Sequence, residues 1–438
     1  MLVVRDAILP DGRTRDVRVD ETSGRIDAVD RSLAATDGVS IDATDKRLFP
    51  GMIDVHVHFR EPGFSHKETW TTGSRSAAAG GVTTVVDQPN TTPPTVTGAA
   101  FDEKAQLARP SLVDYGINGG VTPDWDPDSL FECPLFALGE VFLADSTGEM
   151  GIDTDLFAEA TGRAAAAEVP VTVHAEDATY FDESARNRDD ADAWSAYRTA
   201  EAERVAVERA VNVGAETEAQ LHIAHTSTPE GIDAAAAGDA TCEVTPHHLL
   251  LSRDDLAELG TLGRMNPPLR SEERRAAVYE RVADGTVDVI ATDHAPHTLD
   301  EKDASIWDAP SGVPGVETAL PLLVNEARAG RLSYERVRDL TAANPARIFD
   351  CPRKGRIEPG RDADLVLVDP DETREIRGEA LHSKCGWTPF EGWPGVFPEW
   401  TMRRGEVVYA GADADLPASI SPAGEFTDVP AAQNVRTL

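Results

Sequence analysis

The histidines of this chain stand at the ends of short apolar runs, and this placement constrains the fold more than any other feature of the sequence. Across residues 51–349 such runs alternate with helical stretches at intervals of a few tens of residues, a pattern typical of repeated βα units. The runs are MIDVHVHF, GVTTVVDQPN, LFALGEVFLA, VPVTVHAED, QLHIAHTS, TCEVTPHH and VDVIATDHAP. The pattern predicts an α/β fold with a TIM-like (β/α)8 barrel over residues 51–349, with functional side chains at the carboxyl ends of its strands.

The segments between these runs predict amphipathic helices over 191–213, 228–237 and 272–283. In the first of them Trp194 and Tyr197 are expected to face inward, and Ser271 is placed to cap the last.

Both ends of the chain carry short strand patterns instead of βα units. The first fifty residues alternate apolar and polar side chains between turns such as Asp11-Gly12, and ADLVLVDP and GEVVYAG resume that pattern after residue 350. We therefore expect residues 1–50 and 350–438 to form one small discontinuous β domain beside the barrel. The stretch 411–438 is polar and rich in Pro, Ala and Gly, which predicts a loosely held tail.

Charge and hydropathy exclude several classes of protein. Lys+Arg number 41 against 77 Asp+Glu, a net charge of −36 that rules out a nucleic-acid binder, because phosphate contacts need a basic face. The sequence has neither an apolar run long enough for a membrane span nor a signal-peptide pattern, so a soluble, cytoplasmic protein is expected. Its four cysteines are widely spaced, which indicates neither a disulfide scaffold nor a thiolate zinc site.

The acidity itself points to a halophile. Lysine is scarce, while Asp, Glu and Ala fill the positions expected at the surface. At molar ionic strength the Debye length is about 3 Å, so repulsion among surface carboxylates is screened in concentrated salt.

Four imidazoles and one carboxylate are predicted to meet at one end of the barrel. His56 and His58 are two apart on a strand and share a face, His174 and His225 end two later runs, and Asp293 ends another. Imidazole nitrogens and carboxylates suit zinc, and one ion or two could share this set. A lone H-x-H pair is weak support, but ligand-type residues at four separate strand ends are hard to explain as core histidines. His222 and His248 are expected to pack in the core or to support the ligand residues from behind.

The chain resembles the cyclic amidohydrolases over nearly its whole length, and within them the type I dihydroorotase branch. The matching segments include PGMIDVHVHFREPG, HKETWTTGSRSAAAGGVTTVVDQPNT, VTVHAED, LHIAHTST, EVTPHHLLL, MNPPLRS, ATDHAPHT and KGRIEPGRDADLVLVDP. The resemblance implies reversible cyclisation of N-carbamoyl-L-aspartate to L-dihydroorotate in pyrimidine biosynthesis, by metal-activated water with Asp293 as general acid and base. It implies two zinc ions per chain, with the ligands His56, His58, Glu140, His174, His225 and Asp293.

The resemblance also assigns the residues that hold the substrate. Arg60 stands where the family binds the substrate carboxylate, and its guanidinium fork suits that group. The full set is His58, Phe59, Arg60, Asn90, Asn266, His297, Ser311 and Gly312.

Glu140 departs from the family pattern. Most relatives place a carboxylated lysine there as the bridge between two metals, whereas no lysine lies between residues 105 and 301 of this chain. The carboxylate oxygens of Glu140 lie about 3 to 4 Å closer to the backbone than those of a carboxylated lysine would. Three arrangements are open: Glu140 bridges, Asp145 replaces it, or only one metal binds tightly; we favour Glu140.

Two other functions are weighed against this one. Allantoinase shares the fold and metals, but its sequences usually lack the basic residue that Arg60 supplies. A non-catalytic scaffold is disfavoured because the metal histidines are retained. The expected partner is a small molecule, and a homo-oligomer or an association with another enzyme of the pathway stays open.

Overall fold

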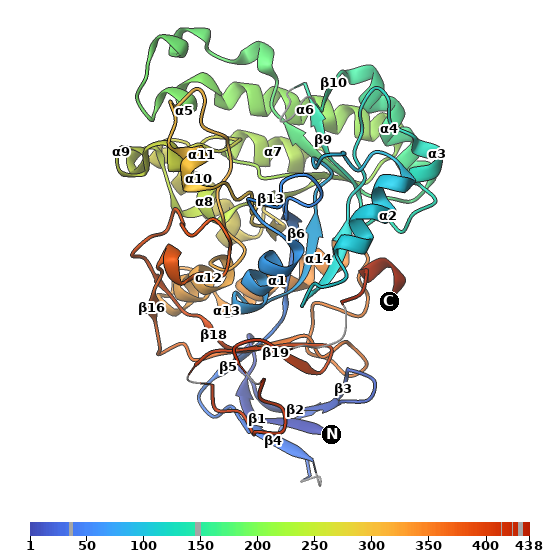
Figure 1. Ribbon diagram of the computed structural model, residues 1–438, viewed down its shortest axis with the longest axis vertical. Helices are drawn as coiled ribbons and strands as arrows, with labels where there is room; N and C mark the ends of the chain where they lie inside the picture. The colour runs from blue at the N-terminus through green and yellow to red at the C-terminus, as the bar shows by residue number, and fades with distance from the viewer. Residues whose placement is uncertain (35–37, 145–149, 413, 423, 428–431) are drawn as a thin grey trace.

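The computed structural model describes residues 1–34, 38–144, 150–412, 414–422, 424–427 and 432–438. Figure 1 shows a large βα unit above a smaller sheet that contains both the first and the last strands of the chain. None of the helices in these ranges is both long and apolar enough to cross a membrane.

The larger unit is a barrel of parallel strands, as the sequence predicts. Its strands are β6 (Met52–Val57), β7 (Val82–Asp87), β8 (Asp114–Ile117), β9 (Leu138–Leu143), β11 (Val171–Ala175), β12 (Leu221–Ile223), β13 (Thr241–Val244) and β14 (Val289–Ile290). They form two parallel sheets, β6-β7-β8 and β9-β11-β12-β13-β14, the second extended at β9 by the short β10 (Gly151–Ile152). Parallel bridges from Gly119 to Leu138 and from Val57 to His294 join the two sheets at both edges and close the barrel.

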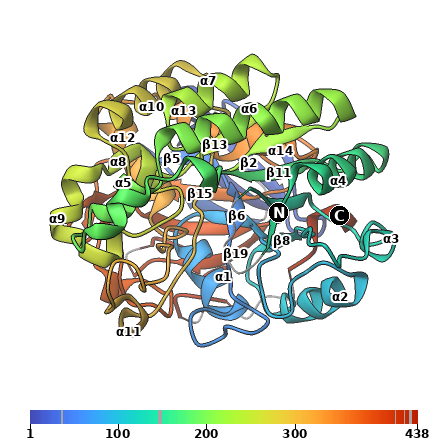
Figure 2. The ribbon, with the colours of Figure 1, turned by 90° about the horizontal axis from the view of Figure 1, so that it is seen from above.

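Helices surround these strands, as the view from above shows (Figure 2). The longer ones are α1 (Trp70–Ala79), α2 (Gly98–Leu107), α4 (Thr154–Ala166), α6 (Ala200–Thr217), α7 (Pro229–Ala237), α10 (Glu272–Asp284) and α12 (Ala319–Arg328). Their buried faces and the strand side chains beneath them form the main apolar core, in which strand residues such as Val85 and Val173 are inaccessible to solvent. This covering leaves the carboxyl ends of the strands as the place for a cavity.

The expected helix over 191–213 is wrong in one respect: it is two helices. α5 (Ala193–Tyr197) ends at Arg198, which is extended, and Thr199 caps α6 by accepting a hydrogen bond from the Ala202 amide. The break has a physical cause, because Arg198 turns inward and donates to Glu176 at 2.6 Å. Apolar periodicity runs through the break and could not reveal it.

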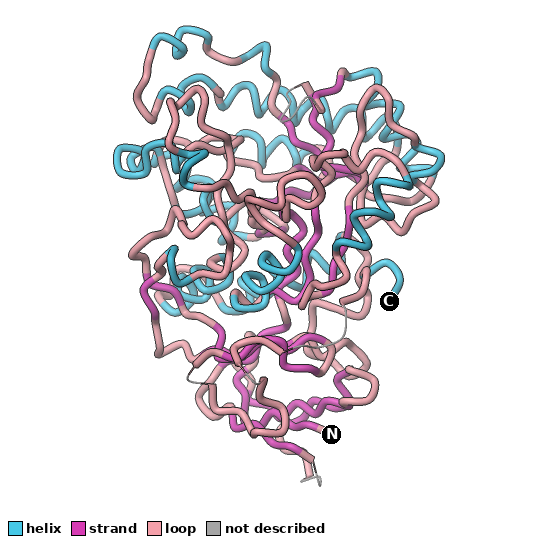
Figure 3. The backbone as a smooth tube through the Cα atoms, in the orientation of Figure 1, coloured by secondary structure: helices cyan, strands magenta, loops and turns pink. Residues whose placement is uncertain are grey.

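The smaller sheet joins the two ends of the chain (Figure 3). Its order is β19 (Glu406–Ala410), β18 (Pro398–Arg403), β15 (Leu365–Val368), β5 (Arg47–Pro50), β1 (Leu2–Ile8), β2 (Thr14–Asp20) and β3 (Arg25–Asp30), and β4 (Val39–Asp42) also pairs with β1. The antiparallel pairing of β5 with β15, with Phe49 opposite Val366, makes the connection.

Parts of the C-terminal third lie against the barrel. Trp387 donates to His297 O at 2.7 Å, and the Val396 amide donates to Pro321 O. The division of the chain at residues 50 and 350 therefore stays a prediction. The expected loose tail is wrong for residues 432–438, where Arg436 donates to Phe136 O at 2.7 Å and the Tyr115 amide donates to Gln433 O.

Candidate active site

A cavity opens where the barrel strands end, and most of the predicted site residues line it. Its lining comprises His58, Arg60, Asn90, Glu140, Phe142, His174, His225, Asn266, Asp293, Ala295, Ser311 and Gly312. These side chains come from the ends of several strands and the loops that follow them, so residues distant in sequence meet in one small volume. Phe142 and Ala295 line it without having been predicted.

One group of potential ligands lies at the end of β6. The ligand atoms of His56, His58 and Asp293 lie within 4.8 Å of one another, and all three residues are buried. His58 Nε2 is 3.0 Å from Asp293 Oδ1, and His56 Nε2 is 3.7 Å from the same oxygen. Asp293 has a φ of 46°, which turns the chain sharply just after β14.

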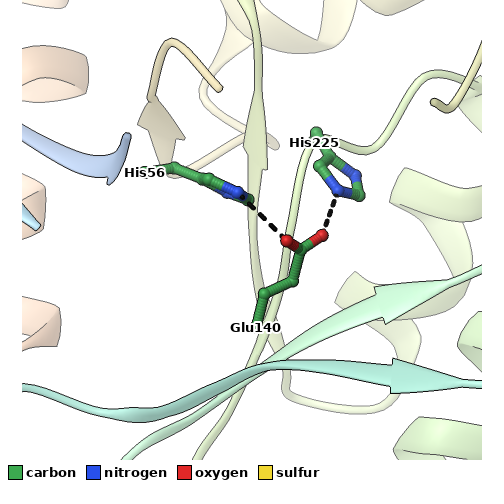
Figure 4. Close-up of side chains that lie close together, drawn as sticks. All are labelled: His56, Glu140 and His225. Atoms are coloured by element: carbon green, nitrogen blue, oxygen red, sulfur yellow. Dashed lines mark hydrogen bonds and ion pairs between the residues drawn. The ribbon is translucent and has the colours of Figure 1, made fainter. Parts of the chain in front are cut away.

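A second group shares His56 with the first. His225 Nε2 lies 2.6 Å from Glu140 Oε1, and His56 Nε2 lies 3.4 Å from Glu140 Oε2, so the carboxylate stands between two imidazoles (Figure 4). His174 Nδ1 is 3.0 Å from Glu140 Oε1. The structure thus brings together the four histidines and two carboxylates predicted as ligands. Asp145, the alternative to Glu140, lies outside the described residues.

Charge at this cluster is set by competition between burial and neighbouring groups. Burial alone would raise the pKa of Glu140, but the charges of His56 and His225 hold that pKa well below its usual range. Burial would also raise the pKa of Asp293, but a hydrogen bond from His58 and the charges of the neighbouring histidines lower it. Both carboxylates are therefore anionic in the buried site.

The residues present fit a divalent cation. Burial alone would lower the pKa of His56, but the charges of Glu243 and Glu140 raise it well above its usual value. Because His56 Nδ1 lies 2.6 Å from the carboxylate of Glu243, Nδ1 keeps its proton, and a cation at Nε2 would replace the second ring proton. His56 Nε2 is buried and has no hydrogen-bond partner among the described residues, and it faces Glu140 and Asp293. An imidazole lone pair beside two buried carboxylates is a donor set of the kind that binds zinc.

Two carboxylates that support these histidines are absent from the sequence-based prediction. Glu243 on β13 contacts His56 Nδ1 through Oε1 and His222 Nε2, at 3.1 Å, through Oε2. Glu176 Oε2 lies 3.3 Å from His174 Nε2 and is held by Arg198. The signal was present, because a charged residue inside or directly after an apolar strand needs a buried partner. His222 has the supporting role expected of it.

Arg60 and its neighbours form a cationic side of the cavity. Arg60 Nη2 lies 3.1 Å from His297 Nε2, and Arg60 Nε donates to Pro296 O. Burial lowers the pKa of Arg60 to about 10, which still leaves it charged at neutral pH. Lys67 Nζ, which was not predicted, lies 3.1 Å from His297 Nδ1. Burial and these cations hold the pKa of His297 far below its usual value, so its ring is neutral.

The other predicted substrate residues differ in their placement. Asn90 Oδ1 lies 2.7 Å from His58 Nδ1 at the cavity wall. Ser311 O accepts from His297 at 2.9 Å, and Gly312 has a φ of +133° with Ala295 O only 2.6 Å from where a Cβ would stand. The ring of Phe59 is fully buried, edge-on to Trp70 at 5.2 Å. Three predicted site residues do not line the cavity, namely His56, Phe59 and His297. His56 contacts the lining residue Glu140 and His297 contacts Arg60, whereas the Phe59 ring packs against Trp70.

Comparisons with known proteins agree on one family. The sequence model of the amidohydrolase family matches residues 47–408 of this chain. A dihydroorotase of Halobacterium salinarum is 69% identical over 412 residues, covering 94% of this chain and 97% of that protein. A dihydroorotase of Methanosarcina acetivorans is 44% identical over 387 residues, covering 84% and 83%. Among solved structures, an L-hydantoinase (dihydropyrimidinase) from Arthrobacter aurescens superposes with a TM-score of 0.89 at 29% identity, covering 94% of this chain and 97% of that one.

Proposed function

Because this chain belongs to the dihydroorotases of the amidohydrolase family, we propose that it interconverts N-carbamoyl-L-aspartate and L-dihydroorotate as a step of pyrimidine biosynthesis. The observation that carries the proposal is the pairing of two environments in one cavity. A cluster of buried imidazoles and carboxylates lies on one side, and Arg60 with His297 lies on the other. The first suits amide hydrolysis, and the second suits a substrate that carries a carboxylate.

We assign two zinc ions per chain to the six ligands His56, His58, Glu140, His174, His225 and Asp293. When bound, such ions lower the pKa of water and polarise a carbonyl group. Glu140 is proposed as the residue shared between the two sites, because it contacts His56 through one oxygen and His225 and His174 through the other. As a direct carboxylate it needs no carbon dioxide to become anionic.

Asp293 is proposed to move the proton. In ring opening, the oxygen of water bonds to the ring carbonyl carbon, the carbon–nitrogen bond breaks, and the nitrogen gains a proton. Asp293 is anionic and lies at the cavity wall, so it can take the proton from water and deliver it to the departing nitrogen. In ring closure the nitrogen bonds to the carboxyl carbon and gives its proton to Asp293. The carbon–oxygen bond then breaks, and Asp293 returns the proton to the departing oxygen, which leaves as water.

The cationic side is proposed to orient the substrate. Arg60 offers a planar fork to the substrate carboxylate, with Asn90 at the cavity wall and the neutral His297 beside Arg60 as further contacts. Holding this carboxylate fixes which carbonyl group faces the zinc ligands. Asn266, Ser311 and Gly312 line the wall beside the ring. Contact by Phe59 is not part of the proposal.

We also place the enzyme in a salt-rich cytoplasm. The net charge of −36 and the scarcity of lysine support this. Its partner is a small molecule, neither nucleic acid nor a membrane.

The deciding assay measures ring opening of dihydroorotate by the zinc-loaded protein in molar KCl. Allantoin and an uncharged dihydropyrimidine serve as competing substrates. We expect the highest kcat/KM for dihydroorotate. A preference for allantoin or the uncharged ring would refute the assignment of substrate, and inactivity on all three would favour the scaffold.

A further inference from the structure

Trp194 lies beside the cavity without lining it, and its indole N–H points at Asn266. Trp194 Nε1 is 3.0 Å from Asn266 Oδ1 and 3.1 Å from Met265 O. The two residues come from different crossovers, because Trp194 belongs to α5 between β11 and β12, whereas Asn266 lies between β13 and β14. Trp194 is 8% exposed. The proposed chemistry gives it no part.

The contact determines which way the amide of Asn266 faces. An indole nitrogen is a hydrogen-bond donor and never an acceptor, so the amide atom beside it must be the oxygen. This resolves the ambiguity between oxygen and nitrogen that an asparagine side chain otherwise has. With the oxygen engaged by Trp194, the NH2 group is the part of the amide available to the cavity that Asn266 lines.

The indole is itself held in place by its neighbours. The guanidinium carbon of Arg264 lies 3.8 Å from the centre of the Trp194 ring, and Arg264 donates to Ile306 O at 2.8 Å. Tyr197 and Trp307 pack on the same indole, with ring centres 5.7 and 5.8 Å away. A donor fixed by several contacts can impose an orientation on a side chain at the edge of a cavity.

We infer that Trp194 is a positioning residue, which fixes Asn266 as a hydrogen-bond donor toward the substrate. The site then accepts a ring that presents a carbonyl oxygen to Asn266 and disfavours one that presents an N–H there. The inference rests on the proposed function only for the identity of the substrate, since dihydroorotate, hydantoins and dihydropyrimidines all carry ring carbonyl groups.

The test is a double-mutant cycle on the zinc-loaded enzyme in molar KCl. Trp194→Phe keeps an aromatic ring and removes the N–H, and we expect KM to rise about tenfold with kcat little changed, the effect of one misdirected hydrogen bond. In an Asn266→Ala background the same change should add nothing. If Trp194→Phe raises KM as much in that background, Trp194 acts through packing and the inference is overturned.

Trp307→Phe is the matched control. It removes an indole N–H from the same aromatic group, but that N–H donates to Arg188 O at 2.8 Å and not to Asn266. We expect its KM to equal that of the unchanged enzyme. A rise equal to that of Trp194→Phe would attribute the effect to the aromatic group as a whole and overturn the inference.

Asn266→Asp gives an independent result on the orientation. One carboxylate oxygen would keep the contact with Trp194 and the other would face the substrate carbonyl, so KM should rise further than in Asn266→Ala. An unchanged KM in Asn266→Asp would show that the cavity needs no hydrogen-bond donor at this position and would overturn the inference. Failure of the proposed function can be told apart from failure of this inference, because the unchanged enzyme would then prefer a different ring as substrate. The double-mutant cycle can be repeated with that ring.

Discussion

Glu243 fixes the ring of His56 from outside the cavity, with its Oε1 atom 2.6 Å from His56 Nδ1. The contact keeps a proton on Nδ1 and turns Nε2 toward Glu140 and Asp293. A carboxylate behind a histidine ligand raises the basicity of the ring and holds its orientation. The same carboxylate reaches His222, so one buried charge orders two rings.

We therefore expect Glu243→Gln to weaken zinc binding about 10- to 100-fold and to reduce activity at limiting zinc. Metal content after dialysis and activity against added zinc measure this. Glu317→Gln is the matched control, because Glu317 is also a buried carboxylate that contacts a histidine, His382 at 2.9 Å, but His382 is not a proposed zinc ligand. Equal zinc affinity in both variants would contradict the role of Glu243.

Asp293→Asn tests the proton transfer. We expect kcat to fall about 10²- to 10⁴-fold, the usual contribution of a positioned acid or base, while the temperature of unfolding stays close to that of the unchanged protein. Zinc content must be measured alongside, because Asp293 is also a proposed ligand. A variant that binds both ions and turns over normally would exclude the proposed role.

Lys67 provides a test of the cationic side. Its ammonium group contacts His297 Nδ1, which directs the neutral ring to donate from Nε2 to Ser311 O or to a bound carboxylate. Lys67→Met should raise KM for dihydroorotate about tenfold, the loss of one charge-assisted contact, and leave the KM of an uncharged dihydropyrimidine unchanged.

The control for Lys67→Met is Lys46→Met, which removes an ion pair with Glu399 in the smaller sheet, away from the cavity. It should change neither KM. An equal loss for charged and uncharged rings in Lys67→Met would show that Lys67 does not act through the substrate carboxylate.

Because Glu140 is itself a carboxylate, we expect the activity of the enzyme not to depend on dissolved bicarbonate. Its carboxylate already contacts His56, His174 and His225, so the unchanged enzyme should have the same activity in buffers depleted of or supplemented with bicarbonate. Glu140→Lys introduces the residue type that the family resemblance implies at this position, and any activity it keeps should depend on bicarbonate. A bicarbonate requirement in the unchanged enzyme would refute Glu140 as the shared ligand.

The sequence predicts the barrel, and the meeting of four histidines with Asp293, from local patterns, whereas Glu140 is implied only by the family resemblance. It does so partly for the wrong reason, since His225 and Asp293 lie beyond the ends of β12 and β14 with φ of 33° and 46°, where alternation along a strand no longer applies. Glu243 carried a signal, as a charged residue inside an apolar strand, but its partner His56 could not be identified because it is distant in sequence. The same holds for Lys67 and its partner His297. Such contacts depend on how the loops cross, which no local period encodes.

Salt dependence tests how the acidic surface is accommodated. With a net charge of −36, carboxylates repel one another across the surface when the Debye length is about 10 Å at 0.1 M salt, and much less when it is about 3 Å at 1 M. We expect the unfolding temperature to rise from 0.1 to 1 M KCl and then to level off. Glu103, Glu216 and Glu273 are exposed on α2, α6 and α10. Replacing all three with lysine brings the net charge to −30 and should make this rise smaller. A rise of the same size in the triple variant would show that salt acts through the apolar core and not through surface charge.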